Sequence, residues 1–138
     1  MKTETLSLDF DTSAKLASLI DALPRQCWKD AIKALPHLPG GWYVEGWLII
    51  NGFPIEHGWR EWEGKIVEPT LYNGLGMCYV YVPGVKYSLD DVIKRVQKEA
   101  VTFPLVGYEA GYGGFGNKSY LNAYNQMLAI CRSNNLHE

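Results

Sequence analysis

The chain of 138 residues has the length of a single domain and is long enough to bury a hydrophobic core. Its 13 basic and 15 acidic residues give a formal net charge of −2, which excludes the strongly basic surface typical of nucleic-acid binding. No apolar run is long enough to span a bilayer and the first residues do not resemble a secretory signal, so we expect a cytoplasmic protein without a membrane partner. Three cysteines at irregular spacing argue against a disulfide framework and against a zinc site. We therefore expect one domain over residues 1–138 with no metal and no other cofactor.

Two helical patterns open the chain. Apolar residues at helical spacing predict a helix over residues 12–23, with Thr12 or Ser13 as its cap. A second, shorter stripe predicts a helix over residues 27–35. Cys27 falls in the first turn of this second helix, where unpaired backbone N–H groups and the helix dipole favour a thiolate.

The pattern then changes from helical to alternating. Residues 42–50 predict a strand, Asn51-Gly52 a hairpin turn, and residues 55–62 the returning strand. Glu63-Gly64 predicts another turn, and residues 65–70 a third strand.

The rest of the chain predicts one strand and two helices. The strand covers Tyr79–Val82 and ends at the Pro-Gly step that follows it. Ser88 caps a helix that runs to about residue 100, and a last helix covers residues 117–132. We expect an α+β fold, with N-terminal helices bearing Cys27 packed on an antiparallel sheet and two further C-terminal helices.

The second hairpin predicts a contact between two polar side chains. If Trp62 and Lys65 flank its turn, Trp59 faces Glu68 across the two strands. His57 shares a face with Trp59 because side chains alternate, so Glu68 lies diagonal to His57, with about 7–8 Å between the Cα atoms. A register shift of one residue would move Glu68 to the opposite face. We expect Trp59 to pack against the imidazole and shield it.

Cys27, His57 and Glu68 supply the three groups that thiol catalysis requires. These are a nucleophile with a lowered pKa, a base beside it and a group that orients the base. The backbone N–H of Cys27 would stabilise an oxyanion, and Gln26 or Trp28 would add a second donor.

Each of these residues also has a structural alternative. Cys27 alone would be a small buried hydrophobe, His57 a hydrogen-bonded sheet residue, and Glu68 a charge on an edge strand. Cys78 and Cys131 are expected in the core.

Two other carboxylates fall on the face of the sheet opposite His57. Glu45 and Glu56 are expected to form a salt bridge there with Arg60 or Lys65.

These segments resemble the transglutaminase-like branch of the papain-type cysteine enzymes. The similarity covers roughly residues 24–70 and is most specific in the His-x-Trp sequence at 57–59 and the acid-Pro-Thr sequence at 68–70; it also includes Cys27 at a helix start and the aromatic run Trp42-Tyr43-Val44-Glu45-Gly46-Trp47. The family usually has Asp where this chain has Glu68, and the spacing from Cys27 to His57 is short for it.

The resemblance implies a papain-like core with a Cys27–His57–Glu68 triad and a thioester intermediate. We therefore predict a cysteine hydrolase or acyl transferase that acts on an amide bond of a peptide or protein substrate. The alternative is a catalytically inactive papain-like fold that binds a peptide or protein in a cleft rich in Trp and Tyr. The sequence leaves open the substrate, the acceptor and the oligomeric state.

Overall fold

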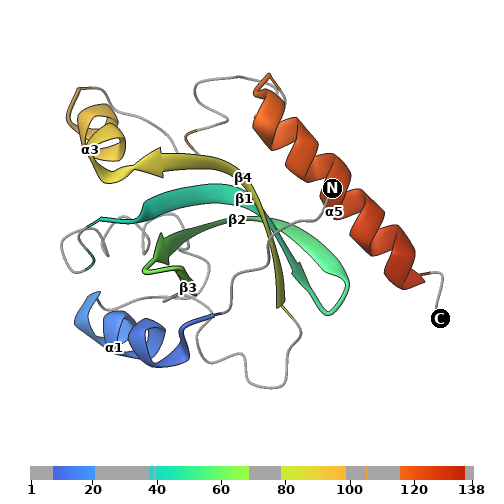
Figure 1. The fold of residues 1–138 in the computed structure, drawn as a ribbon, viewed down its shortest axis with the longest axis horizontal. Coiled ribbons are helices and arrows are strands. Elements are labelled where there is room, and N and C mark those ends of the chain that lie inside the picture. The colour runs from blue at the N-terminus through green and yellow to red at the C-terminus, as the bar shows by residue number, and fades with distance from the viewer. Residues whose placement is uncertain are drawn as a thin grey trace.

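A computed structural model describes residues 8–20, 38, 40–68, 79–98, 105 and 116–135. Within these residues a four-stranded antiparallel sheet is accompanied by three helices, which confirms the predicted α+β class. In chain order the elements are α1 (Phe10–Ile20), β1 (Trp42–Ile50), β2 (Phe53–Trp62), β3 (Lys65–Val67), β4 (Tyr79–Ser88), α3 (Leu89–Lys98) and α5 (Lys118–Asn135). Figure 1 shows the sheet in the centre, with α1 and α5 on different sides of it.

The strands lie in the order β3-β2-β1-β4, and two tight turns join the first three. Asn51 and Gly52 have φ values of 49° and 86°, and Glu63 and Gly64 have 50° and 74°. Two successive left-handed residues define a type I′ turn, which matches the twist of a hairpin and favours Gly. The second turn pairs Trp62 with Lys65, which confirms the predicted register of β2 and β3.

Strand β4 is longer than predicted, because Pro83-Gly84 does not end it. The strand continues to Ser88, and its register against β1 shifts between Glu45 and Gly46, as in a β-bulge. The backbone approaches closely here, because a Cβ atom on Gly46 would lie 2.3 Å from the carbonyl oxygen of Val82. The bulge therefore accommodates a proline that would otherwise interrupt the ladder.

Helix α1 begins two residues earlier than predicted. Asp9 caps it, since its Oδ1 accepts a hydrogen bond from the Thr12 backbone N–H at 3.1 Å and its Oδ2 accepts one from the Thr12 hydroxyl at 2.8 Å. The hydrogen bond from the Thr12 backbone N–H is the main reason why the pKa of Asp9 lies below 3.8. Ser13, one of the two predicted caps, lies instead in the first turn of the helix. The second predicted helix, with Cys27, lies outside the described residues.

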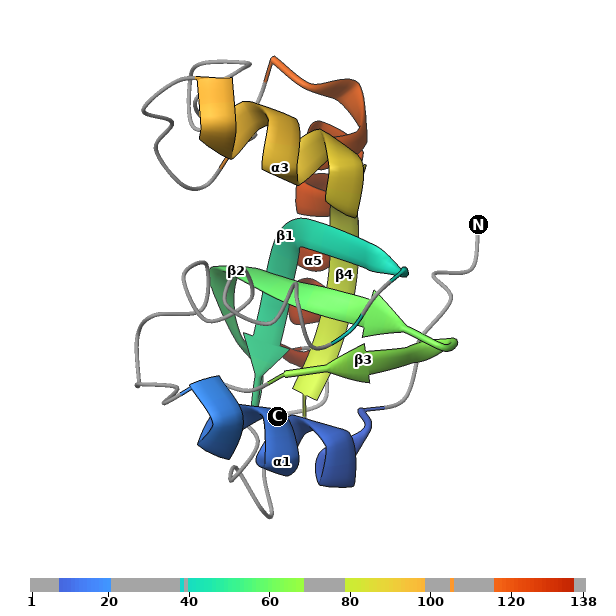
Figure 2. The ribbon, with the colours of Figure 1, turned by 90° about the vertical axis from the view of Figure 1, so that its left-hand side faces the viewer.

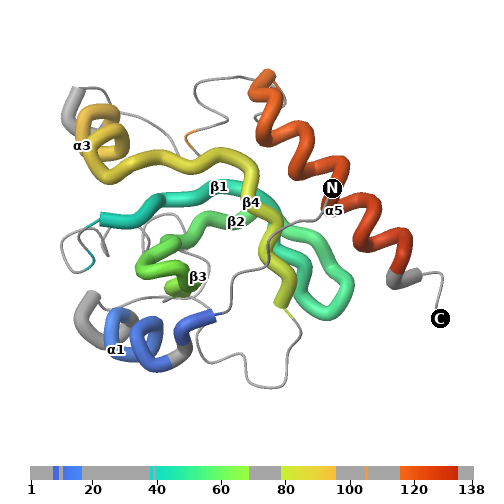
Figure 3. The backbone as a smooth tube through the Cα atoms, viewed as in Figure 1, coloured from blue at the N-terminus to red at the C-terminus, as the bar shows by residue number. Residues whose placement is uncertain are grey.

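The two faces of the sheet pack differently. On the face that we call the α5 face, Ile49 and Val82 contact Ala123 and Met127 of α5. Figure 2 shows α5 running behind the sheet, and Figure 3 shows the same helix beside the β1–β2 hairpin. On the opposite face, which we call the His57 face, a second cluster joins all four strands; its members are Val44, Leu48, Trp59, Ile66 and Tyr81.

The prediction that Glu45 and Glu56 form salt bridges with Arg60 or Lys65 is wrong, because neither carboxylate pairs with these two residues in the part of the chain that the structure describes. Arg60 is fully buried, and its guanidinium donates to three backbone carbonyl oxygens, those of Leu38, Gly40 and Trp42, at 2.8–3.0 Å. Burial lowers the pKa of Arg60 to about 10. Its hydrogen bonds therefore attach β2 to the segment that leads into β1.

The two carboxylates accept hydrogen bonds from neutral donors instead. Glu45 Oε2 accepts from the Tyr43 hydroxyl at 2.6 Å and from the Leu105 backbone N–H at 2.7 Å, and Glu56 accepts from the Tyr120 hydroxyl. Tyr43 lies two positions before Glu45 in β1, whereas Leu105 and Tyr120 come from parts of the chain that the strand pattern does not specify.

Candidate active site

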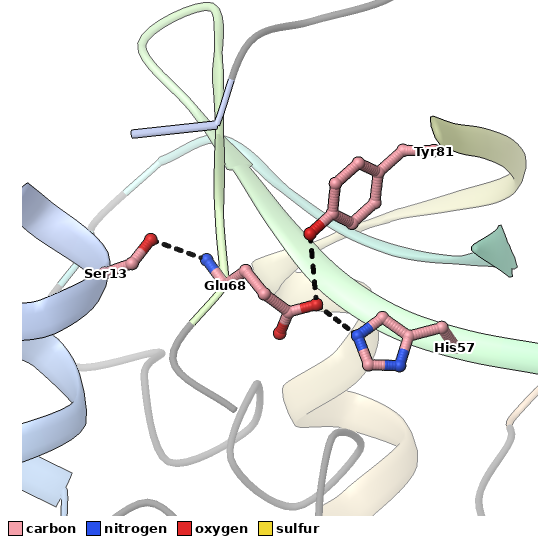
Figure 4. A network of polar contacts seen from close by, with 4 residues as sticks. All are labelled: Ser13, His57, Glu68 and Tyr81. Atoms are coloured by element: carbon pink, nitrogen blue, oxygen red, sulfur yellow. Dashed lines mark hydrogen bonds and ion pairs between the residues drawn. The ribbon is translucent and has the colours of Figure 1, made fainter. Parts of the chain in front are cut away.

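The His57 face brings together two of the three residues predicted to form a triad. His57 Nε2 contacts Glu68 Oε1, and the side chains are only 4% and 1% exposed (Figure 4). Glu68 directly follows β3. Because Glu61 pairs with Ile66, the same register places Glu68 opposite Trp59, as predicted. The predicted diagonal contact is therefore present.

When Glu68 is ionised, its contact with His57 determines which ring nitrogen of the imidazole carries the proton. An ionised carboxylate can only accept hydrogen bonds, so Nε2 of the imidazole must donate to it. In the neutral imidazole, Nδ1 is then the basic nitrogen. An arrangement of this kind suits a general base whose ring is oriented by a buried acid.

Helix α1 holds the backbone of Glu68. The backbone N–H of Glu68 donates to Ser13 Oγ at 2.8 Å, and the Ser13 hydroxyl donates to the carbonyl oxygen of Asp9 at 2.6 Å. The N–H of Asp9 in turn donates to the carbonyl oxygen of Ile66 at 2.7 Å, next to a parallel bridge between Leu8 and Ile66. The main chain at Glu68 is therefore attached to both β3 and the first turn of α1.

Aromatic rings surround the imidazole and the carboxylate. Trp59 stacks on His57 with 6.2 Å between ring centroids and 23° between planes, so the expected packing is present. Tyr81 meets Trp59 edge-on at 5.0 Å, and its hydroxyl donates to Glu68 Oε1 at 3.4 Å. Burial, together with the nearby Glu68 carboxylate, raises the pKa of the Tyr81 phenol.

The hydrogen bond between Tyr81 and Glu68 reveals how strongly the sheet curls. Tyr81 belongs to β4 and Glu68 follows β3, and these strands form opposite edges of the sheet. In a flat sheet, three strand spacings would separate them by about 14 Å. Curling towards the His57 face brings the two edges within reach of each other's side chains.

The predicted nucleophile lies outside the described residues, as do both proposed oxyanion donors. This applies to Cys27, Gln26 and Trp28, and also to Cys78. Cys131 is a partly buried residue of α5 whose thiol lies 3.7 Å from the carbonyl oxygen of Gly52. Across the described part of the chain, no three His, Cys, Asp or Glu side chains are grouped so that they would hold a metal ion.

Two residues of the site were not predicted from sequence, Ser13 and Tyr81. Ser13 carried a signal only as a helix cap, and its contact with Glu68 spans 55 positions. Tyr81 belongs to a predicted strand, but the pairing of that strand with β1 has no short turn to reveal it.

No helix within the described ranges combines the length and the apolar character needed to cross a bilayer. A scan of protein-family models and searches of curated proteins and of solved structures found no match to this chain.

Proposed function

We propose that the protein is a cysteine hydrolase or acyl transferase that acts on an amide bond. The observation that carries the proposal is the buried contact between His57 Nε2 and the Glu68 carboxylate. It gives an imidazole of defined orientation on the face of a curled sheet. The proposal also includes a papain-like arrangement, in which the helix that begins near Cys27 brings its sulfur to Nδ1 of His57.

The reaction proceeds in two halves. Cys27 loses its proton to His57, and the sulfur attacks the carbonyl carbon of the amide. The C–N bond then breaks as His57 returns the proton to the departing amine, which leaves a thioester on Cys27. Water or an acceptor amine, deprotonated by His57, attacks the thioester and releases the thiol.

Each supporting group has a separate role in this scheme. Glu68 orients His57 and stabilises the imidazolium that forms in both halves. The backbone N–H of Cys27, with Gln26 or Trp28 as a second donor, stabilises the oxyanion. One such donor lowers the barrier by about 3–4 kcal/mol.

Selective alkylation tests the proposal. At neutral pH, iodoacetamide should modify Cys27 much faster than Cys78 or Cys131, and His57→Ala should remove this advantage. Peptide mass spectrometry measures all three rates in one sample, so the two other thiols are internal controls. An activated ester should also leave an acyl group on Cys27 in the wild type.

Exposed apolar side chains favour a second candidate, a non-catalytic module that binds peptides. Phe53 and Ile55 are 77% and 39% exposed, and strand alternation places both on the His57 face. Large exposed apolar residues often mark interaction sites. Equal and slow alkylation of all three thiols would reject the enzyme and favour this module, with His57 and Glu68 as a buried structural pair.

A further inference from the structure

We propose that Tyr81 is a positioning residue, which holds the Glu68 carboxylate and sets how strongly it attracts the proton of His57. The catalytic meaning of this inference depends on the proposed function. Its physical content is a coupling between a phenol and an imidazole through one carboxylate oxygen, and this coupling can be measured without any reaction.

The hydrogen bonds of Glu68 are asymmetric. The hydroxyl of Tyr81 and Nε2 of His57 both approach Oε1, whereas Oε2 is buried and has no hydrogen-bond partner among the described residues. Figure 4 shows the two donors meeting at this oxygen from different sides. Because they share it, a hydrogen bond from Tyr81 withdraws negative charge that would otherwise stabilise the imidazolium of His57.

Tyr81 is fixed in place and remains a donor. It is 4% exposed, and its ring packs edge-on against Trp59 at 5.0 Å and against Tyr79 at 6.4 Å. Because its pKa is raised, the hydroxyl keeps its proton throughout the neutral range. A neutral phenol is therefore always available to the carboxylate.

A glutamate needs this second constraint more than an aspartate does. Its extra methylene adds one rotatable bond, which must be ordered before the carboxylate can orient a base. Ser13 fixes only the backbone N–H of Glu68, at 2.8 Å. Tyr81 acts on the carboxylate itself, so the two contacts together constrain both ends of the side chain.

The test is the pKa of His57, followed by NMR in the wild type and in two tyrosine variants. Tyr81→Phe keeps the ring packing but removes the donor, and should raise the pKa of His57 by about 0.5 to 1. Tyr43→Phe is the matched control, because it also removes a buried phenol from a carboxylate, that of Glu45 at 2.6 Å on the α5 face. It should leave the pKa of His57 unchanged even though it destabilises the fold.

Replacement of Tyr81 by 3,5-difluorotyrosine is a second test, which keeps both the ring and the hydroxyl and therefore creates no cavity. Its more acidic hydroxyl is a stronger donor, so the pKa of His57 should fall. The proposal is overturned if neither substitution at Tyr81 moves this pKa, or if Tyr43→Phe moves it equally. Slow alkylation of Cys27 in the wild type would instead reject the proposed function, while a shifted His57 pKa would still establish the coupling.

Discussion

Glu68→Asp introduces the acid that is usual in transglutaminase-like enzymes, yet we expect this substitution to impair the protein. The backbone N–H of Glu68 is held by Ser13 at 2.8 Å, and β3 is held beside it by the hydrogen bond from Asp9 to Ile66 at 2.7 Å. Shortening the side chain by one C–C bond therefore withdraws the carboxylate by about 1.5 Å. A hydrogen bond of normal length to His57 would open to about 4 Å, beyond the range of such bonds.

The expected loss follows from this displacement. Misplacing a catalytic group by about 1 Å can reduce a rate about 10²-fold, which corresponds to about 2.7 kcal/mol. We therefore expect iodoacetamide to alkylate Cys27 about 10²-fold more slowly in Glu68→Asp than in the wild type. Peptide mass spectrometry at neutral pH, with the reagent in excess, gives the rate constants.

Glu63→Asp is the matched control, because this substitution also shortens a glutamate by one methylene, but in the exposed turn of the same hairpin. It should alkylate at the rate of the wild type. A Glu68→Asp protein as reactive as the wild type would refute the reasoning, since either the backbone would have moved or the length of the acid would not position His57.

Three further predictions concern stability. Ser13→Ala leaves a buried backbone N–H without its acceptor, so urea unfolding should show a loss of about 1–3 kcal/mol, whereas Ser119→Ala on an exposed position of α5 should change little. Asp9→Ala should reduce the free energy of unfolding by about 0.5–1 kcal/mol at pH 7. Because folding lowers the pKa of Asp9, the stability difference between wild type and variant should be full above pH 3.8 and should disappear as the pH falls through the pKa of Asp9 in the folded state. Burial raises the pKa values of Tyr81 and Tyr120 above 10.0, so the fold should lose stability as the pH rises past 10.0, and ultraviolet titration should show both phenols ionising only on unfolding.

The contact between His57 and Glu68 could be predicted because a local turn determines it. Glu63-Gly64 allows a two-residue turn, the turn fixes the register, and alternation then assigns each side chain to a face. Every step uses residues within one hairpin. The strands of the first hairpin were predictable for the same reason.

Contacts between distant segments could not be predicted in this way. Alternation correctly placed Glu45 on the face opposite His57, but it does not reveal what covers that face. One of the two donors to Glu45 that the structure shows is the Leu105 backbone N–H, which lies 60 positions away. The contribution of Tyr81 likewise depends on the curl of the whole sheet and on a bulge beside Gly46.

The local origin of the pair between His57 and Glu68 has a consequence for the order of folding. The two residues are only eleven positions apart, in a hairpin closed by a two-residue turn. Isolated hairpins form in about 1–10 μs, whereas long-range strand pairing is slower. The register that brings imidazole and carboxylate together is thus set early, and later docking of α1 and β4 adds the contacts of Ser13 and Tyr81 with Glu68. Mutations in the distant parts of the chain would then slow maturation of the site without scrambling its acid–base pair.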